Sequence, residues 1–201
     1  MATRCAIVLA GAIAVGCLLG AAGGRGAKEI VIAIPDYQRE PYADLDTGTN
    51  TIVQAHGDVV DALLRQLRAP ALPNDRKVLI IYSLGHLRDP RAASALIANI
   101  GLRAEKMDPK LGFARWRQFP AQEALVRIGR HASWVLMSII GSAKFDKAQV
   151  GAYARVLSDI EQPRYAVMKL KDRAKQVTDE AAKEQFQLVI DRIQSTSAGN
   201  Q

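Results

Sequence analysis

Cysteine is almost absent from this sequence: its two cysteines, Cys5 and Cys17, both lie close to the N-terminus. The rest of the chain therefore has no disulfide framework and no zinc site of the cysteine type. Catalytic motifs are missing too, since there is no Gly-x-Ser-x-Gly elbow, Walker loop, His-Glu-x-x-His pair or dinucleotide fingerprint. Nucleophilic and phosphoryl-transfer catalysis are thus without support.

A long block of like charge is also missing, although the chain has a formal net charge of +7. Its basic residues are spread along the sequence, so charge by itself points only weakly to an acidic partner. The chain has 201 residues, 49% of them hydrophobic. This is enough to bury a core and predicts one globular domain with appendages.

The first segment has the layout of a secretory signal peptide. Arg4 precedes an apolar stretch over Cys5–Leu19, and small residues follow. Cleavage after Ala22 would place Gly20 and Ala22 at the two small positions that a signal peptidase requires. We expect a signal peptide over residues 1–22 and a protein exported to the periplasm or beyond the cell.

Two alternatives to a cleaved leader remain. "AVGC" resembles a lipobox, in which Cys17 would carry lipid and anchor the protein to the envelope, although Ala14 stands where leucine is usual. An uncleaved membrane anchor is the other alternative, because the apolar run approaches the ~18 to 20 residues that span a bilayer. The membrane is expected to be contacted only through the leader or this lipid.

Residues 23–50 predict an extended arm or linker. Ile30, Ile32 and Ile34 alternate as in a short strand, and Pro35 and Pro41 then interrupt the pattern. From Thr51 the period becomes helical, with Asn50 available as N-cap. The apolar stripe of this first helix consists of Ile52, Val59, Val60, Leu63, Leu64 and Leu67.

An elbow between two helices is predicted at "LGHLRDPR". Leu84 and Leu87 close the stripe of one helix, Asp89 can cap the next, and Pro90 suits its first position because no amide hydrogen is needed there. The second helix presents Ala93, Leu96, Ile97 and Ile100. Each helix of such a pair covers its partner only in part, which calls for neighbouring pairs.

The elbow recurs along the chain, which indicates an internal repeat. "LVRIGRHA" and "LSDIEQPR" can be laid on "LGHLRDPR", so that Leu84, Leu125 and Leu157 correspond at spacings of 41 and 32 residues. The second unit continues through Trp134, Leu136, Ile139 and Ile140. The third opens at the N-cap Asp146 and presents Val150, Tyr153, Val156 and Leu157, then Tyr165, Val167, Met168 and Leu170.

A last helix is predicted from Asp179 to about Ile193, capped by Thr178, with Phe186, Val189, Ile190 and Ile193 apolar. Residues 196–201 form a polar tail that we expect to be disordered. The repeat domain thus extends over residues 51–195.

Residues 79–142 resemble the HEAT-like repeats of the bilin-lyase type. "YSLGHLRDPRAASALI" and "FPAQEALVRIGRHASWVL" carry similar elbows, with Leu84, Gly85, Asp89, Pro90 and Arg91 in the first and Leu125 and Gly129 in the second. The resemblance implies an all-α fold, a right-handed α-solenoid of about three helix pairs. It implies an adaptor surface as function, with a chromophore-handling or lyase-type enzyme as the alternative.

The segment 102–118 is long for a repeat connector and supplies the best binding candidates: Phe113, Arg115, Trp116 and Arg117. Trp and Arg are enriched in interface hot spots, and long loops are often functional. The alternative is that Trp116 fills a gap between the first two units.

Other chemistry has weaker support. His56, His86 and His131 lack metal-ligand spacing, and we expect His86 and His131 near helix C-termini. "DLDTGTN" lacks the closing Glu of a calcium loop. Lys169, Lys171, Arg173 and Lys175 fit a solvated face, although an anionic surface remains a third candidate. We expect no metal, no cofactor and no nucleic acid, and a protein as partner.

Overall fold

The structure is a computed structural model that describes residues 58–70, 72–104 and 118–198. Within these ranges the chain is all-helical and contains no strand, which confirms the all-α prediction there. The leader and the arm lie outside the described residues. The helices are α2 (Val59–Leu67), α3 (Asn74–Leu87), α4 (Ala93–Ile97), α5 (Pro120–Ile128), α6 (Arg130–Ile140), α7 (Val150–Glu161), α8 (Pro163–Gln176) and α9 (Glu180–Ala198).

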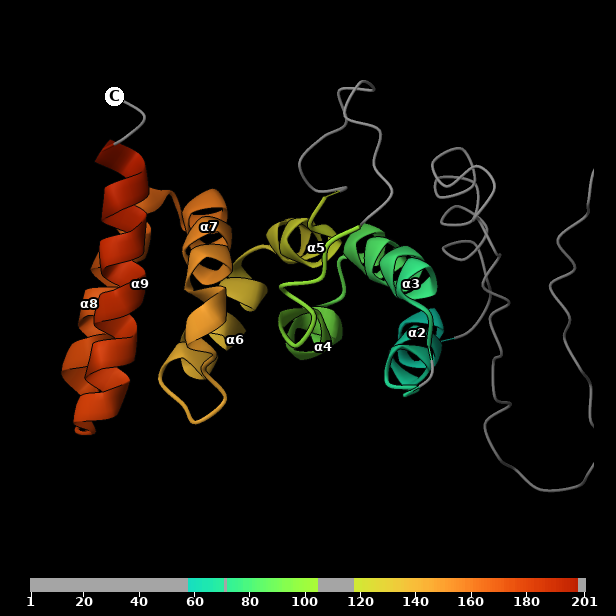
Figure 1. Ribbon diagram of the computed structural model, residues 1–201, viewed down its shortest axis with the longest axis horizontal. Coiled ribbons are helices and arrows are strands. Elements are labelled where there is room, and N and C mark those ends of the chain that lie inside the picture. The colour runs from blue at the N-terminus through green and yellow to red at the C-terminus, as the bar shows by residue number, and fades with distance from the viewer. Residues whose placement is uncertain (1–57, 71, 105–117, 199–201) are drawn as a thin grey trace, which may run out of the picture.

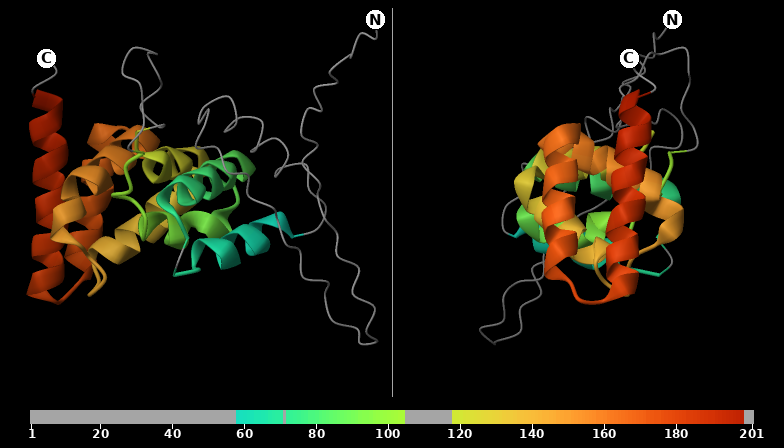
Figure 2. Two further views of the ribbon diagram at one scale, coloured as in Figure 1. Left: turned by 45° about the vertical axis from the view of Figure 1, so that its right-hand side comes forward. Right: turned by 90° about the vertical axis from the view of Figure 1, so that its left-hand side faces the viewer.

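The described helices follow one another along the long axis of the molecule (Figure 1). Helix α3 packs against α5 and α5 against α7, while α4 packs against α6. At the C-terminal end α9 lies beside α8 and also contacts α7 (Figure 2). Helices that stand two apart in the chain are therefore neighbours in space.

Each of three helix pairs turns through an elbow that contains one residue with positive φ. These residues are Arg88 (φ 53°), Gly129 (φ 75°) and Gln162 (φ 67°), and the described ranges contain no others. Arg88 and Asp89 separate α3 from the 3-10 turn Pro90–Ala92, whereas Gly129 alone separates α5 from α6. The first elbow is thus one residue longer than the second.

Two predicted caps are confirmed, Asp89 at the first elbow and Asp146 in the connection from α6 to α7. The Asp89 carboxylate accepts a hydrogen bond from the amide of Arg91, and that of Asp146 accepts one from Ala148. Both caps open 3-10 turns, Pro90–Ala92 and Lys147–Gln149, which lead into α4 and α7.

Other predicted helix ends are wrong or untested. Helix α2 begins at Val59 with Asp58 as its cap, whereas the predicted start at Thr51 and the predicted cap Asn50 lie outside the described residues. Helix α4 ends at Ile97, so the buried Ile100 belongs to the turn that follows. Asp179, and not Thr178, accepts from the amide of Ala181 at the start of α9.

Helix α9 continues past the predicted end at Ile193 to Ala198, into the segment expected to be disordered. Three hydroxyls of this last stretch bond to carbonyls one turn earlier: those of Ser195 and Thr196 to Arg192, and that of Ser197 to Ile193. Such back-bonds satisfy short polar side chains within a helix. Polarity alone therefore did not mark the end of the helix.

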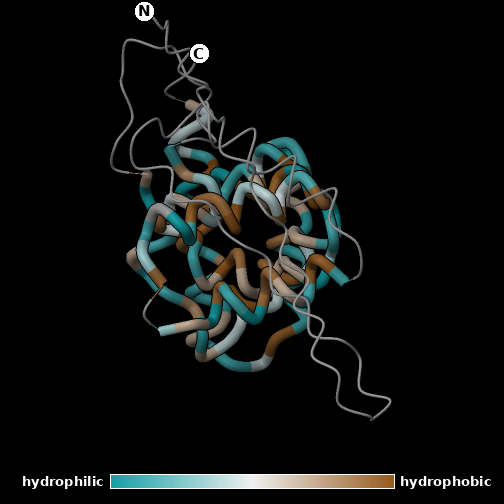
Figure 3. The backbone as a smooth tube through the Cα atoms, turned by 90° about the vertical axis from the view of Figure 1, so that its right-hand side faces the viewer, coloured by the Kyte–Doolittle hydropathy of each residue, from teal (hydrophilic) through white to brown (hydrophobic). Residues whose placement is uncertain are grey.

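One hydrophobic core runs through the described chain, from α2 to α9. Leu84, Leu125 and Leu157, which the sequence analysis predicted to be equivalent, are all fully buried. In Figure 3 hydrophobic and hydrophilic stretches alternate along the helices, as amphipathic helices require. The predicted stripes of α2 and α9 are confirmed for the residues that the structure describes, and Ile52 lies outside them. The buried members are Val59, Val60, Leu63, Leu64, Leu67, Phe186, Val189, Ile190 and Ile193.

A buried amide links three neighbouring segments. Gln122 of α5 donates a hydrogen bond to the carbonyl of Ile100 at 3.1 Å and accepts one from Arg155 of α7 at 3.4 Å. Arg155 also lies over the ring of Phe119, 5.2 Å from its centre. Because a buried amide is costly to leave unpaired, these bonds fix the register of α5 between its neighbours.

Candidate binding site

The residues predicted to form the first elbow come together as a structural joint. Gly85 lies against α5, where a side-chain carbon at this position would stand 2.8 Å from Cβ of Ala124. The Arg91 guanidinium bonds to Asp89 and also to Asp58, the cap of α2. Hydrogen bonds from Arg91 hold the pKa of both carboxyl groups below the ordinary value. This joint is exposed at its charged end and contains no nucleophile.

The predicted binding residues Phe113, Arg115, Trp116 and Arg117 lie outside the described residues. The two ends of their segment are described, and they are joined: the amide of Ala104 donates to the carbonyl of Gln118 at 3.1 Å. Ala104 and Gln118 are therefore neighbours in space just before the start of α5.

The histidines do not form a site in the part of the chain that the structure describes. His86 lies in the last turn of α3, as predicted, with its ring 4.6 Å from that of Tyr82. His131 is exposed in the first turn of α6, so its predicted place at a helix C-terminus is wrong. The described ranges hold no group of three potential metal-ligating side chains.

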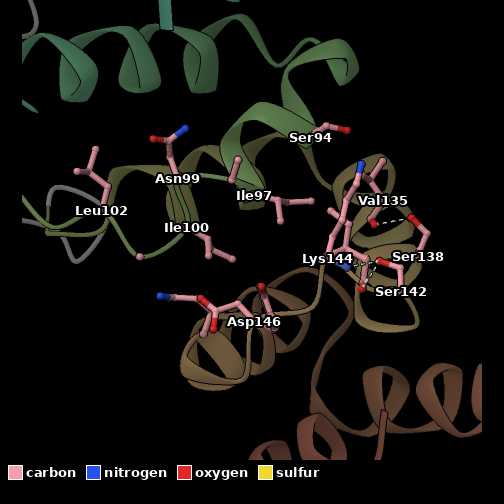
Figure 4. A pocket seen from close by; sticks show the side chains of 15 residues that line it. Ser94, Ile97, Asn99, Ile100, Leu102, Val135, Ser138, Ser142, Lys144 and Asp146 are labelled. Carbon is pink, nitrogen blue, oxygen red and sulfur yellow. Dashed lines mark hydrogen bonds between the residues drawn. The ribbon is translucent and has the colours of Figure 1, made fainter. Parts of the chain in front are cut away.

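A pocket of about 800 Å³ opens between α4 and α6 (Figure 4). Ile97 and Ile100 line it from α4 and the turn after it, and Val135 and Ile139 line it from α6. Lys144 and Asp146 of the α6–α7 connection stand at its polar side, with Gln149 and Tyr153 beyond them. The pocket thus combines an apolar wall with a polar margin, which is common among ligand sites.

Three polar side chains of this pocket are bonded within their own helix or turn. Asn99 donates to the carbonyl of Ala95, Ser138 to that of Val135, and Ser142 to that of Ile139. Burial, with the Asp146 carboxylate nearby, raises the pKa of Tyr153, so its hydroxyl stays protonated at neutral pH.

Three large apolar side chains stand exposed on α6 and α8. Trp134 is 63% exposed, Tyr165 53% and Met168 51%. The sequence assigned all three to core stripes, which is wrong; α6 buries Leu136 and Ile140, and α8 buries Ala166 and Leu170. Arg173 of α8 lies over the Trp134 ring at 5.6 Å from its centre. Exposed aromatic and apolar groups of this size are typical of interaction surfaces.

A buried carboxylate lies between the same two helices. Glu161, whose side chain is only 8% exposed, accepts a hydrogen bond from Lys169 at 2.5 Å. Burial acts to raise the pKa of Glu161, but Lys169, Ser133 and Arg130 outweigh it and hold that pKa below its ordinary range. The ion pair with Glu161 thereby offsets the charge of Lys169. The residues of the predicted solvated face that remain exposed are Lys171, Arg173 and Lys175.

Sequence reasoning missed Trp134, and its equivalent position on α4 emerges only from burial in the structure. The stretches Ala92–Ile100 and Ala132–Ile140 have identical patterns of burial at a spacing of 40 residues. In this alignment Trp134 corresponds to the exposed Ser94.

No helix in the described ranges is both long and apolar enough to cross a lipid bilayer. A comparison with protein-family models finds no match, and searches of curated proteins and of solved structures find no similar protein.

Proposed function

We propose that this chain is a non-enzymatic scaffold of HEAT-like repeats that binds another protein. In this proposal the helices form a right-handed α-solenoid of about three helix pairs, α3 with α4, α5 with α6 and α7 with α8. Support comes from the three elbows with their positive-φ residues, and from the packing of α3 on α5 and of α5 on α7. Repeats of this kind stack in one direction and offer long surfaces.

The observation that carries the binding function is the exposed Trp134 with Arg173 over its ring. Tryptophan and arginine are the residue types most enriched in interface hot spots. A tryptophan that served only stability would be expected in the core, where large apolar groups contribute most. The loop residues Phe113, Arg115, Trp116 and Arg117 are proposed as a second contact.

The place of action follows from the leader. We propose that the signal peptide over residues 1–22 directs export, so that the mature chain meets its partner in the periplasm or outside the cell. An intact-mass measurement on protein expressed with a secretion pathway tests this step. Loss of the leader is expected, and a cytosolic product that retains Met1 or an unlipidated Cys17 would contradict it.

A ligand-handling enzyme of the bilin-lyase type is the second candidate. The pocket between α4 and α6, at about 800 Å³, falls within the size range of small-molecule sites and supports this alternative. A coloured or metal-bearing protein on purification would favour it. Purification without bound chromophore, together with capture of a protein partner, would favour the scaffold.

The decisive experiment is a cross-linked pull-down from envelope extract with the mature chain and two matched variants. Trp134→Ala removes the exposed ring on α6, and Leu188→Ala removes an exposed apolar side chain on α9. We expect partner capture to be lost for Trp134→Ala and kept for Leu188→Ala. Equal capture by both variants, at equal melting temperature, would overturn the role of Trp134.

A further inference from the structure

One end of the molecule is formed by the hairpin of α8 and α9. The two helices lie side by side, run in opposite directions and are joined by the short connection 177–179. In the right-hand view of Figure 2 they face the viewer, and no other described helix stands in front of them. With respect to the described residues, this outer face of the hairpin is open to a partner.

Four residues of α8 form one stripe on the outer face. Counted away from the turn, they follow one another at steps of four, three and four residues, which places them on one side of the helix over about 16 Å. All four side chains are exposed. The members of this α8 stripe are Lys175, Lys171, Met168 and Arg164.

Four residues of α9 form a matching stripe. They also follow one another at steps of four, three and four residues away from the turn, and all four are exposed. The members of this α9 stripe are Glu180, Glu184, Gln187 and Asp191. Three cations on α8 are thus matched by three carboxylates on α9, in the same order and at the same spacing.

The two stripes border the same face of the hairpin. Lys175 of α8 lines a hollow between the two helices together with Glu184 and Gln187 of α9. Because both helices start from one short turn, each member of a stripe is level with its counterpart on the other helix to within about one helical turn of 5.4 Å. Lys171 is thus the counterpart of Glu184.

The stripes do not neutralise each other within one chain. In the described ranges no ion pair joins α8 to α9, and the side chains of Arg164, Lys171 and Glu184 take part in none at all. Lys175 and Glu180 each pair with a neighbour on their own helix, at 3.2 and 2.6 Å. Charges of both signs are therefore available at the outer face.

We propose that this face binds the same face of a second copy of the chain. A two-fold axis parallel to the helices places the α8 stripe of each copy on the α9 stripe of the other. Each cation then meets its acidic counterpart, as Lys171 meets Glu184 of the second copy, and every contact occurs twice. Met168 packs on the aliphatic part of Gln187 between these ion pairs.

The charges select both the partner and the axis. The α9 stripe repels an anionic membrane or nucleic acid, and the α8 stripe repels a purely basic partner. A partner must carry both signs in mirrored order, which a second copy does by symmetry. A two-fold axis across the helices would place each stripe on its own copy, with like charges in contact, so the axis parallel to the helices is the one that the charges allow.

This face is separate from the exposed Trp134. Arg173, which lies over the Trp134 ring, follows Lys171 by two residues and so points about 200° away from it around α8. The inference therefore does not depend on the proposed binding of another protein through Trp134.

Sedimentation equilibrium of the full mature chain tests the inference. We expect a monomer–dimer equilibrium in low salt, with a dissociation constant that rises about tenfold at high salt because exposed ion pairs are screened. Lys171→Glu brings like charges together twice in each dimer and should weaken association about tenfold or more, as should Glu184→Lys. Lys144→Glu reverses an exposed charge on the α6–α7 connection and should associate as the native protein does.

Mixing the two variants is the sharpest test. In a mixed dimer of Lys171→Glu with Glu184→Lys, both substituted positions face an opposite charge, so the two should associate with each other although each associates poorly with itself. A chain with both substitutions should self-associate again for the same reason. Melting curves identify any variant that has lost its fold, and unfolded chains would not restore association on mixing.

Four results would overturn the inference. The first is a native chain that stays monomeric in low salt, and the second is a dimer that neither Lys171→Glu nor Glu184→Lys weakens. The third is a native dimer whose two variants fail to associate on mixing. The last is a dimer that Trp134→Ala abolishes and Lys171→Glu leaves intact, which would place self-association on α6 instead.

Discussion

The guanidinium of Arg91 donates two hydrogen bonds, of 2.7 and 3.1 Å, to the carboxylate of Asp58, which lies 33 residues earlier in the chain. Asp58 also caps α2, and Arg91 also binds Asp89, the cap of the first elbow. One cation thus joins the caps of two separate helical segments. It fixes α2 to the elbow between α3 and α4.

This joint predicts a loss of stability in acid. The pKa values of Asp58 and Asp89 are lowered by their hydrogen bonds to Arg91, so the contribution of the joint is fully present above their ordinary value of 3.8. It disappears as the pH falls through the lowered values. We expect Arg91→Gln to lower the melting temperature near neutral pH, modestly because the groups are exposed.

The control for this prediction is Arg88→Gln, which removes a neighbouring exposed arginine with no such partner. It should melt like the native protein. The difference between native protein and Arg91→Gln should shrink below pH 3.8. A difference of constant size down through that range would show that charge is not its cause.

Leu84→Ala should remove about 2 to 5 kcal/mol from the free energy of unfolding, because it opens a cavity at a fully buried position of α3. Urea unfolding measures the loss. Leu188→Ala, at a position 41% exposed, should change the free energy by no more than about 0.5 kcal/mol. An unchanged midpoint for Leu84→Ala would mean that α3 does not pack through this side chain.

Gly85→Ala and Gly151→Ala should change the free energy of unfolding in opposite directions, although both glycines lie in helices. Alanine usually stabilises a helix relative to glycine, by about 0.4 to 1 kcal/mol. At Gly151 the new carbon would meet only the end of Arg192, at 3.8 Å, so this gain is expected. At Gly85 it would stand 2.8 Å from Cβ of Ala124, and overpacking should cost about 1 to 3 kcal/mol. Stabilisation by both would argue against the close contact of α3 with α5.

The second and third elbows predict another pair of opposite effects. Gly129 has φ 75° and ψ −137°, a region open to glycine, and Gln162 has φ 67° and ψ 146°. Gly129→Ala should lower the free energy of unfolding by about 1 to 3 kcal/mol, although the added methyl group would have no atom within 4 Å. Gln162→Gly should raise the free energy of unfolding by about 1 kcal/mol. This gain is the backbone strain that is relieved, reduced by the conformational entropy that glycine loses on folding. Thermal unfolding compares them, and destabilisation by Gln162→Gly would contradict the strained backbone.

The sequence predicted the features that depend on local chemistry and on the spacing of the apolar residues. Asp89 and Asp146 were recognisable because a carboxylate before a helix start satisfies free amides. Leu84, Leu125 and Leu157 were recognisable because each is followed three residues later by Leu or Ile and then by a turn. The two glycines were harder: Gly129 provides a positive φ, whereas Gly85 provides room for Ala124, so they occupy different points of their elbows.

The candidate surface was missed because apolar residues were assigned to the core. Trp134, Tyr165 and Met168 continue apolar patterns in α6 and α8, but which side of such a helix is buried depends on its neighbours. In α8, Ala166 and Leu170 are enough to fill the contact with α7 and α9, and the larger side chains remain outside. That outcome follows from packing between distant segments, which a single sequence does not contain.

The hydrogen bond between Ala104 and Gln118 also bears on the insertions and deletions that the chain tolerates between these two residues. Because these two residues stay adjacent, the stretch encoded between them can lengthen or shorten while the helices on either side keep their places. These two residues therefore mark a position at which a reporter domain or a new recognition segment can be inserted while the described helices keep their arrangement.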